Sequence, residues 1–370
     1  MLRGAIAEID LNAITYNLGI VKAITRDRPV IAVVKADAYG HGAVEVSKRL
    51  ESEGIALFAV AFIDEGVKLR EAGIRSSILV LFDKYDLAAF FEYHLIPVIH
   101  DLQTARRLSE EARKRENPLD VHLKIDTGMG RLGLCDKGEM EQVMTIAKMG
   151  YLNVRGLMSH FSDSDISDKS FALAQLKRFH EVRELITRET GSPLLCHMAN
   201  SAATVSLPHA YLDAVRPGLM LYGYSPFGGK GALSSGSTLK PAMTIKAKIL
   251  SLRKFQKGIP VSYGRTFITA RESVVAVLSV GYADGYSRQF SNAIDVIVQG
   301  KRVPVVGRVC MDLTMVDVTG IEGVEEGEEA VLLGAQGSQK VDAWEMAGKA
   351  ATIPYEILTS MGNRSRRVYV

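Results

Sequence analysis

The segment AVVKADAYGHG, residues 32–42, places Lys35 at the end of an apolar run. If this run is a strand, Ile31, Val33 and Lys35 share one face, so an inward-facing Lys35 ammonium needs a partner or a lowered pKa. A desolvated lysine amine is also the group that forms imines with carbonyl compounds. The spacing therefore leaves two interpretations of Lys35 open: a reactive amine, or an ammonium that reaches solvent at the strand end.

A second polar pattern occurs in VHLKID, residues 121–126. Strand alternation puts His122, Lys124 and Asp126 on one face and the apolar residues on the other. In a barrel of parallel strands the apolar face packs against the outer helices, so the polar face is expected to point into the barrel. Its charges must then satisfy one another or a ligand.

Further polar residues stand at or just after the ends of later apolar runs: His160, Asn200-Ser201 and Arg216-Pro217-Gly218. In barrels of alternating strands and helices, active sites lie at the carboxyl ends of the strands. Ser201 falls where a helix is expected to begin and to offer free N–H groups to an anion. Together with the two lysines, these residues indicate an anion-binding catalytic mouth.

Two motifs carry weaker signals. GMGRLG, residues 128–133, matches the dinucleotide-binding pattern GxGxxG, but the next expected strand ends at His160 without the acidic residue that such a site needs. We therefore reject a dinucleotide site. Tyr263, in VSYGRTF, is either a turn-packing aromatic residue or a functional phenol, and Cys310 is a single thiol of the kind that is usually an inert core residue.

The elements that must position these residues alternate between short β-branched runs and longer amphipathic segments through the first 220 residues. This alternation is typical of βα units and a parallel sheet. Eight such runs predict an N-terminal (β/α)8, TIM-like barrel, with a doubly wound sheet as the alternative fold. The runs lie at Val30–Lys35, Leu57–Ala61, Ile78–Phe82, Leu95–Ile99, Val121–Ile125, Val154–His160, Leu194–His197 and Ala214–Leu221.

A loop-like segment, SPFGGKGALSSGS at residues 225–237, separates this part from a region whose strands lack intervening helices. The change predicts a barrel domain over residues 1–236 and a mostly β C-terminal domain over residues 237–370. Helices are expected at Asp342–Ala350 and Pro354–Ser360. The expected strands are Thr244–Leu252, Ser273–Val280, Asp295–Val298, Val303–Cys310, Met315–Val318 and Ala330–Leu333.

The composition excludes several classes of partner. With 45 Lys and Arg against 42 Asp and Glu, the net charge of +3 gives no basis for binding nucleic acid, and the basic cluster of Arg364, Arg366 and Arg367 is expected to be a solvated tail. The three cysteines lie far apart without CxxC spacing, which predicts neither a disulfide framework nor a zinc site. No apolar stretch approaches a membrane span and the N-terminus lacks the apolar run of a signal peptide, so we expect a cytoplasmic protein without a membrane partner.

The motifs resemble those of bacterial alanine racemases, which are pyridoxal 5'-phosphate enzymes. The similar blocks occur in family order across essentially the whole chain. Asp37 stands where many members carry Asn, a variation that leaves the lysine motif intact. The blocks are AVVKADAYGHG (32–42), LKIDTGMGRLG (123–133), HMANSAA (197–203), VRPGLMLYG (215–223), VSYGRTF (261–267), VGYADGYSR (280–288), VGRVCMDLTMVDVT (306–319) and IPYE (353–356).

The resemblance implies a (β/α)8 barrel followed by a β domain, in a head-to-tail homodimer with shared active sites. It implies that Lys35 binds the cofactor covalently, and that Lys35 and Tyr263 are the two catalytic bases, with Tyr263 coming from the other subunit. Lys124 is implied to be a carbamate that braces Arg131, the alternative being an ammonium paired with Asp126. Cofactor-binding residues are implied at Lys35, Tyr39, Arg131, His160, Asn200, Ser201, Arg216, Gly218 and Tyr355, and substrate-binding residues at Arg131, Tyr282, Met311 and Tyr355.

The implied reaction is the interconversion of L-alanine and D-alanine, which supplies D-alanine for cell-wall peptidoglycan. Proton removal on one face of the substrate and delivery on the other require two bases. No metal is implied. The alternatives are a racemase of another small amino acid, such as serine, and a non-catalytic pyridoxal-phosphate carrier.

Overall fold

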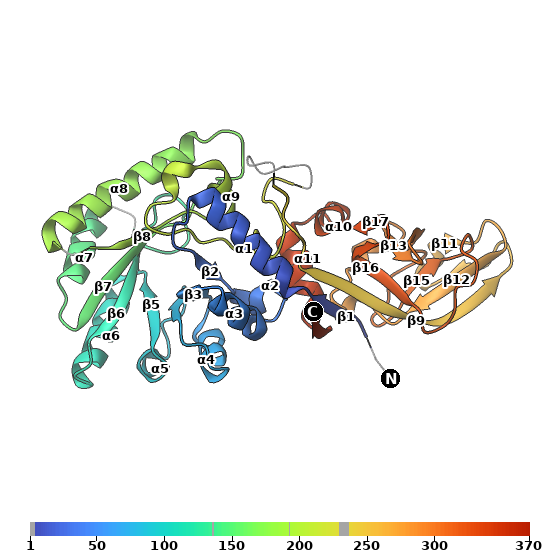
Figure 1. Ribbon diagram of the computed structural model, residues 1–370, viewed down its shortest axis with the longest axis horizontal. Coiled ribbons are helices and arrows are strands. Elements are labelled where there is room, and N and C mark those ends of the chain that lie inside the picture. The colour runs from blue at the N-terminus through green and yellow to red at the C-terminus, as the bar shows by residue number, and fades with distance from the viewer. Residues whose placement is uncertain (1–3, 135–136, 192, 229–236) are drawn as a thin grey trace. The chain divides into compact units, whose positions relative to one another are not determined.

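The structure is a computed structural model that describes residues 4–134, 137–191, 193–228 and 237–370. The described residues form two compact units (Figure 1). The barrel unit comprises Thr15–Ala36 and Ala43–Leu239, and the β unit takes its residues from Met1–Ile14, Asp37–Gly42 and Lys240–Val370. The domain division expected between residues 236 and 237 stays a prediction, and residues 229–236 of the expected linker lie outside the described residues.

The barrel unit is built on a seven-stranded sheet in which every neighbouring pair is parallel and the strand order follows the chain. A doubly wound sheet would reverse its order, so the barrel prediction is confirmed. Isolated parallel bridges, Val30 to Val215 and His197 to Ala214, join the two edges. The strands are β2 (Ile31–Val33), β3 (Leu57–Val60), β4 (Ser77–Val80), β5 (Leu95–Ile99), β6 (Leu119–Lys124), β7 (Leu152–Met158) and β8 (Leu195–His197).

The eighth predicted strand, Ala214–Leu221, is wrong as a continuous strand. Only Ala214 and Val215 make ladder bridges, because Pro217 has no N–H to donate and the chain turns after it. The bond from the Ile31 N–H to the Val215 carbonyl, at 2.8 Å, still closes the barrel next to the strand that leads to Lys35.

Helices cover the outer side of these strands, as Figure 1 shows for α6, α7 and α8 outside β5 to β7. The amphipathic pattern explains this: α6 buries Ala105, Leu108 and Ala112, and Asp101 caps its start by accepting the Thr104 N–H at 2.7 Å. The helices of this part of the chain are α1 (Leu11–Thr25), α2 (Lys35–Tyr39), α3 (Ala43–Ser52), α4 (Ile63–Glu71), α5 (Leu87–Glu92), α6 (Leu102–Lys114), α7 (Lys137–Ala147), α8 (Ser170–Thr190), α9 (Ser201–Ser206) and the 3-10 turn η1 (Pro208–Ala210).

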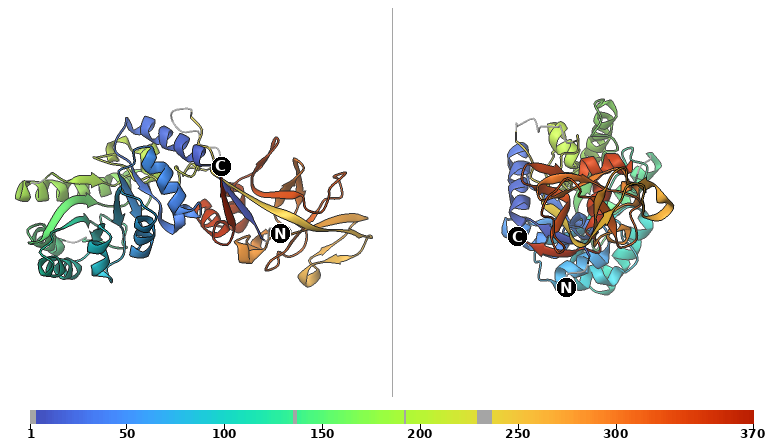
Figure 2. Two further views of the ribbon diagram at one scale, coloured as in Figure 1. Left: turned by 60° about the horizontal axis from the view of Figure 1, so that its bottom comes forward. Right: turned by 90° about the vertical axis from the view of Figure 1, so that its right-hand side faces the viewer.

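The β unit contains a nine-stranded sheet with the path β14-β13-β16-β9-β1-β18, and β12 and β15 continue from β9. Figure 2 shows the long strand β9 (gold) crossing this unit. The expected helices are present as α10 (Ala343–Ala350) and α11 (Pro354–Met361). The strands are β1 (Ile6–Ile9), β9 (Met243–Phe255), β10 (Pro260–Val261), β11 (Phe267–Ile268), β12 (Ser273–Leu278), β13 (Asp295–Val298), β14 (Lys301–Pro304), β15 (Thr314–Asp317), β16 (Glu329–Gln336), β17 (Gln339–Val341) and β18 (Arg366–Tyr369), with 3-10 turns η2 (Tyr263–Arg265), η3 (Tyr282–Asp284) and η4 (Arg288–Phe290).

The basic cluster near the C-terminus is not a solvated tail, and that prediction is wrong. Strand β18 pairs in parallel with β1, which the sequence analysis missed, beginning with Ile6 opposite Arg366. The Arg367 guanidinium donates to the Gly40 carbonyl at 2.9 Å and lies 2.7 Å from the Asp37 carboxylate. The expected strand Val303–Cys310 was also too long, since β14 ends at Pro304.

The expectations about membrane spans, metal sites and cysteines can be compared with the described residues. No helix within the described ranges is long and apolar enough to cross a membrane. Among the same residues no cluster of histidine, cysteine, aspartate or glutamate is suited to a metal ion. Cys196 and Cys310 are free thiols.

Candidate active site

Lys35 stands two residues beyond β2, at the mouth formed by the carboxyl ends of the barrel strands. Its ammonium has no ion pair or hydrogen bond to another described residue. Burial lowers the pKa of Lys35, the nearby Arg131 charge lowers it further, and Glu65 acts in the opposite direction. The surroundings therefore shift Lys35 in the direction of the neutral amine, which is the nucleophilic form.

The turn that follows Lys35 has an unusual backbone. Ala36, Asp37, Ala38 and Tyr39 all have φ between 52° and 54°, the left-handed region that non-glycine residues avoid. Such strain persists only where the surroundings hold it, and it is typical of functional sites. Here the Glu65 carboxylate accepts the Ala36 N–H at 2.6 Å, directly after the lysine.

Arg216 is buried in the barrel with 4% of its surface exposed. Its guanidinium donates to the carbonyls of Ser159, His197 and Met198 at 2.6, 2.7 and 3.3 Å, and to ring nitrogens of His197 and His160 at 2.8 and 3.3 Å. All five acceptors are neutral, so no carboxylate among them balances the charge. The group therefore presents a fixed positive hydrogen-bond donor inside the barrel.

A histidine pair extends from this arginine. Because a guanidinium only donates, His197 must accept at Nδ1 and carry its proton on Nε2, which lies 2.8 Å from His122 Nδ1. Burial and the Arg216 charge lower the pKa of both histidines, so both are neutral. Gly156 on β7 makes this contact sterically allowed, since a Cβ there would lie 2.4 Å from the His122 ring.

Lys124 is a lysine buried inside the barrel. Its side chain is 1% exposed and its Nζ has no hydrogen-bond partner among the described residues. Burial, followed by the Arg216 charge, lowers its pKa to about 8, while Asp126 opposes this shift. No ion pair joins Lys124 to Asp126 within the described part of the chain, although the ammonium alternative required one.

Asp126 instead organises the glycine-rich turn GMGRLG. Its Oδ1 accepts the N–H groups of Gly128, Met129 and Gly130 at 2.9, 2.7 and 3.1 Å, and its Oδ2 accepts the Arg131 N–H at 3.0 Å. Burial alone would raise the pKa of this carboxyl, but the four N–H donors hold it below its usual value. The motif therefore binds a carboxylate of its own chain and presents Arg131 at the mouth.

Ser201 and Gly218 meet at the same mouth, beside the strand that leads to Lys35, because the Val33 N–H donates to the Pro217 carbonyl at 3.2 Å. The Ser201 hydroxyl accepts the N–H groups of Gly218 and Met220 at 3.1 and 3.3 Å. Asn200 caps α9 by accepting the Ala203 N–H at 2.9 Å. The barrel unit thus brings together seven of the site residues expected from the sequence: Lys35, Arg131, His160, Asn200, Ser201, Arg216 and Gly218.

The remaining expected site residues belong to the β unit. Tyr263, Tyr282 and Met311 are 71%, 42% and 55% exposed. Their loops are joined, because the Tyr282 N–H donates to the Cys310 carbonyl at 3.0 Å and Cys310 and Tyr263 line one cavity of about 520 Å³. The rings of Tyr39, which is buried, and Tyr355, which is half-buried, lie 5.9 Å apart and form a separate pair in the same unit.

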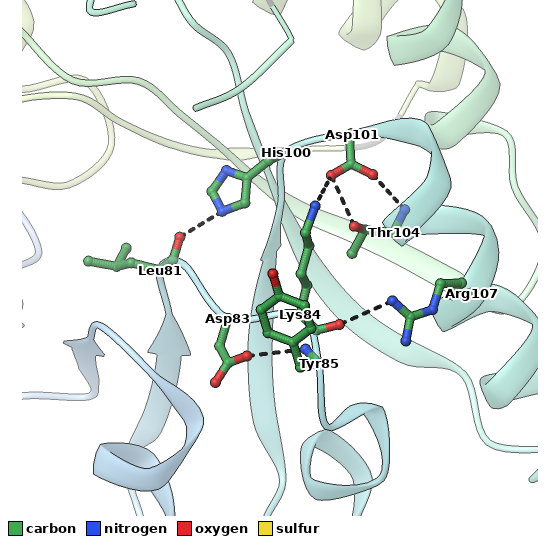
Figure 3. A network of polar contacts seen from close by, with 8 residues as sticks. All are labelled: Leu81, Asp83, Lys84, Tyr85, His100, Asp101, Thr104 and Arg107. Carbon is green, nitrogen blue, oxygen red and sulfur yellow. Dashed lines mark hydrogen bonds and ion pairs between the residues drawn. The ribbon is translucent and has the colours of Figure 1, made fainter. Parts of the chain in front are cut away.

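The loop after β4 was not singled out by the sequence analysis. It carries Phe82, whose ring centroid is 5.2 Å from Lys35 Nζ and 5.7 Å from Arg131 Cζ. Figure 3 shows His100 and Asp101, which follow β5, in contact with this loop: His100 Nε2 donates to the Leu81 carbonyl at 2.8 Å, and Lys84 donates to the Asp101 carboxylate at 2.9 Å. His197 and Gly156 were also given no role, although a glycine inside a strand is a known sign of close approach.

Comparison with known proteins agrees with this geometry. Residues 9–226 match the family model of the alanine racemase N-terminal domain, and residues 242–369 match that of the C-terminal domain. The chain belongs to the alanine racemase family. It is 48% identical over 368 residues to an alanine racemase of Thermodesulfovibrio yellowstonii, covering 98% of this chain and 97% of that protein.

Solved alanine racemases share the fold. That of Clostridium difficile 630 superposes with a TM-score of 0.93 at 32% identity, covering 100% of this chain and 96% of the other. The enzyme from Bartonella henselae, solved with covalently bound pyridoxal phosphate, has a TM-score of 0.89 at 30% identity and is covered over its full length, as is this chain. The protein is therefore an alanine racemase enzyme, with the barrel and the mostly β region that the resemblance implied.

Proposed function

We propose that this enzyme interconverts L-alanine and D-alanine with pyridoxal 5'-phosphate bound covalently through Lys35. The observation that carries the proposal is the Lys35 amine, which has no ion pair or hydrogen bond among the described residues, in one mouth with the buried Arg216. Among the same residues the acceptors of Arg216 include no carboxylate. The covalently bound cofactor of the Bartonella henselae relative supports the same assignment.

The donor set fits this cofactor in its chemistry. Lys35 supplies an amine for the aldehyde, and Arg216 supplies a donor for the pyridine nitrogen. Tyr39, Ser201, Tyr355 and the backbone around Gly218 would bind the phosphate, and Arg131 the phenolic oxygen. Asn200 would also contact the cofactor. When bound, pyridoxal phosphate delocalises the negative charge that remains after an α-proton is removed from an amino acid.

Two residues of this chain would carry out the proton transfers, one on each face of the substrate. Lys35 holds or releases the proton on one face of the substrate, and Tyr263 of the partner subunit does so on the other. Tyr263 acts as a base only as its anion, which positive charge or hydrogen-bond donors would stabilise, and a chain through His160 and Arg216 would supply them. Arg216 donates a hydrogen bond but keeps its proton, which limits charge delocalisation and disfavours transamination.

Substrate recognition is assigned to Arg131, Tyr282, Met311 and Tyr355. Arg131 and the partner's Met311 would bind the substrate carboxylate, and Tyr282 would lie near the entrance. Tyr355 over the substrate side chain would leave room for little beyond a methyl group. We further propose a homodimer with shared sites, located in the cytoplasm, whose D-alanine serves peptidoglycan synthesis.

We also propose that Lys124 carries a carbamate that braces Arg131. Its buried Nζ, which has no hydrogen-bond partner in the part of the chain that the structure describes, and its lowered pKa make the neutral amine accessible, as reaction with carbon dioxide requires. The carbamate would replace a repulsion from Arg131 with an attraction. Electron density at high resolution, or intact-protein mass with and without bicarbonate, tests this, and an unmodified Nζ would exclude it.

The activity is tested with a panel of L-amino acids, scored for the D-enantiomer with and without added pyridoxal phosphate. Alanine is expected to react fastest, and only with the cofactor. Borohydride reduction followed by peptide mapping is expected to place the cofactor on Lys35. Faster turnover of serine would identify a different racemase, and cofactor binding without any racemisation would identify a carrier.

A further inference from the structure

Phe82 contacts both cations at the mouth of the barrel. Lys35 Nζ lies 5.2 Å and Arg131 Cζ lies 5.7 Å from the centre of its ring, both within the roughly 6 Å range of a cation–π contact. Neither cation makes an ion pair or a side-chain hydrogen bond to any other described residue. The phenyl ring is thus the shared attractive partner of two groups that repel each other.

The ring sits on a loop whose backbone is held from two sides. Leu81 donates its N–H to the carbonyl of Val60, the last residue of β3, at 2.9 Å, and Phe82 donates to the next carbonyl, that of Ala61, at 3.0 Å. On the other side, His100 Nε2 holds the Leu81 carbonyl, as Figure 3 shows. The Asp83 carboxylate accepts the Ile63 N–H at 3.2 Å. Phe82 therefore stands on a fixed support rather than on a free loop.

The neighbouring ring of Phe62 provides a control that separates the electrostatic effect of the Phe82 ring on the cations from the effect of its packing. Phe62 packs edge-on against Phe82, with centroids 6.2 Å apart and planes at 65°. It is 52% exposed, and no cation–π contact of Phe62 occurs among the described residues. Phe62 is thus a matched aromatic residue that touches the same ring without touching the cations.

We propose that Phe82 is a positioning residue, whose ring holds the Lys35 amine and the Arg131 guanidinium in place for cofactor and substrate. The negative face of the ring favours the charged form of Lys35 and so limits the effect of burial on that amine. The ring also fixes the plane of Arg131. The part played by cofactor and substrate rests on the proposed function, but the contact with the two cations does not.

The test measures the pKa of Lys35 in the full-length, cofactor-free protein, from the pH dependence of its labelling by trinitrobenzenesulfonate and peptide mapping. Loss of the ring in Phe82→Leu is expected to lower this pKa by about 0.4–0.7, which speeds labelling about three- to five-fold below the pKa. Phe82→Tyr and Phe62→Leu are expected to keep the wild-type profile. Phe82→Met serves the same purpose as Phe82→Leu if the latter is unstable by circular dichroism.

A second measurement uses the enzyme loaded with pyridoxal phosphate. A loosened Arg131 is expected to raise KM for alanine several-fold in Phe82→Leu while kcat changes less than about two-fold, and Phe82→Tyr is expected to restore KM. An unchanged Lys35 profile together with unchanged KM in a folded Phe82→Leu protein would overturn the proposal. Absence of racemisation in the wild type would reject the proposed function alone, because the labelling profile does not depend on it.

Discussion

Replacing Gly156 with alanine places a methyl group against the buried histidine pair. The new Cβ would lie 2.4 Å from both Cε1 and Nδ1 of His122, whereas ordinary contact begins at 3.4 Å, so the imidazole must move by about 1 Å. His122 is 2% exposed and its Nδ1 lies 2.8 Å from His197 Nε2. A displacement of this size breaks that hydrogen bond within a packed core.

The expected cost follows from these two effects. Overpacking of a well-packed core costs about 1–3 kcal/mol, and a lost buried hydrogen bond adds about 1 kcal/mol, which together lower the free energy of unfolding by about 2–4 kcal/mol. At roughly 2–4 °C per kcal/mol for a unit of this size, the midpoint of thermal unfolding is expected to fall by at least about 4 °C.

Two comparisons isolate the clash. Gly150→Ala is the matched control, because a Cβ there meets nothing within 4 Å. In a double-mutant cycle, His122→Ala removes the ring, so Gly156→Ala is expected to cost less than about 1 kcal/mol in that background. Equal unfolding midpoints for Gly156→Ala and Gly150→Ala, or additive effects in the cycle, would refute the reasoning.

Further predictions concern the bases, the charges and the assembly. Tyr263→Phe is expected to abolish racemisation in both directions while D-alanine, but not L-alanine, still exchanges its α-hydrogen in deuterated water by NMR; equal exchange would remove Tyr263 from its role. Arg216→Glu is expected to add a long-wavelength absorbance band and to raise pyruvate formation from alanine, whereas an unchanged spectrum would contradict the account of Arg216. Mixing Lys35→Ala with Tyr263→Phe under subunit exchange is expected to restore about a quarter of wild-type activity, since half of the dimers are mixed and each has one intact site; no recovery would reject shared sites. Asp126→Asn is expected to cost about 1–3 kcal/mol at pH 7 in urea unfolding. Because the folded-state pKa of Asp126 is lowered, its contribution is present above the unfolded value near ~3.9 and is lost as pH falls through the folded pKa, so a difference that does not shrink on acidification would exclude this role.

Several features followed from local sequence alone. The alternation of short β-branched runs with amphipathic segments predicted the barrel, because the periodicity of a strand or a helix depends on residues that are close in the sequence. The same alternation predicted that His122 and Lys124 share one face of their strand, and both side chains are buried in the structure. A lysine after an apolar run made Lys35 a candidate reactive amine, with an ammonium that reaches solvent as the alternative, without any knowledge of its neighbours.

The edges of the β unit could not be predicted in this way. Strand β1 lies near the start of the chain and pairs with β18 at its end. Each strand is only four residues long, which is too short for a clear alternation of apolar and polar residues. The charge of the arginines in β18 suggested that they lie in solvent. Strand pairing and the Asp37 carboxylate decide where they lie instead.

Neighbouring residues along the chain are enough to show which residue types stand on each strand, how they are spaced and in what order the motifs follow. These features depend only on local chemistry and on the order of residues in the chain. Which side chains touch was decided by the tertiary structure alone. His122 and His197 are 75 positions apart and meet only because β7 offers Gly156 between them. Phe82 has no reactive group to draw notice, and it becomes part of the site only because closure of the barrel brings Lys35 and Arg131 to the same ring.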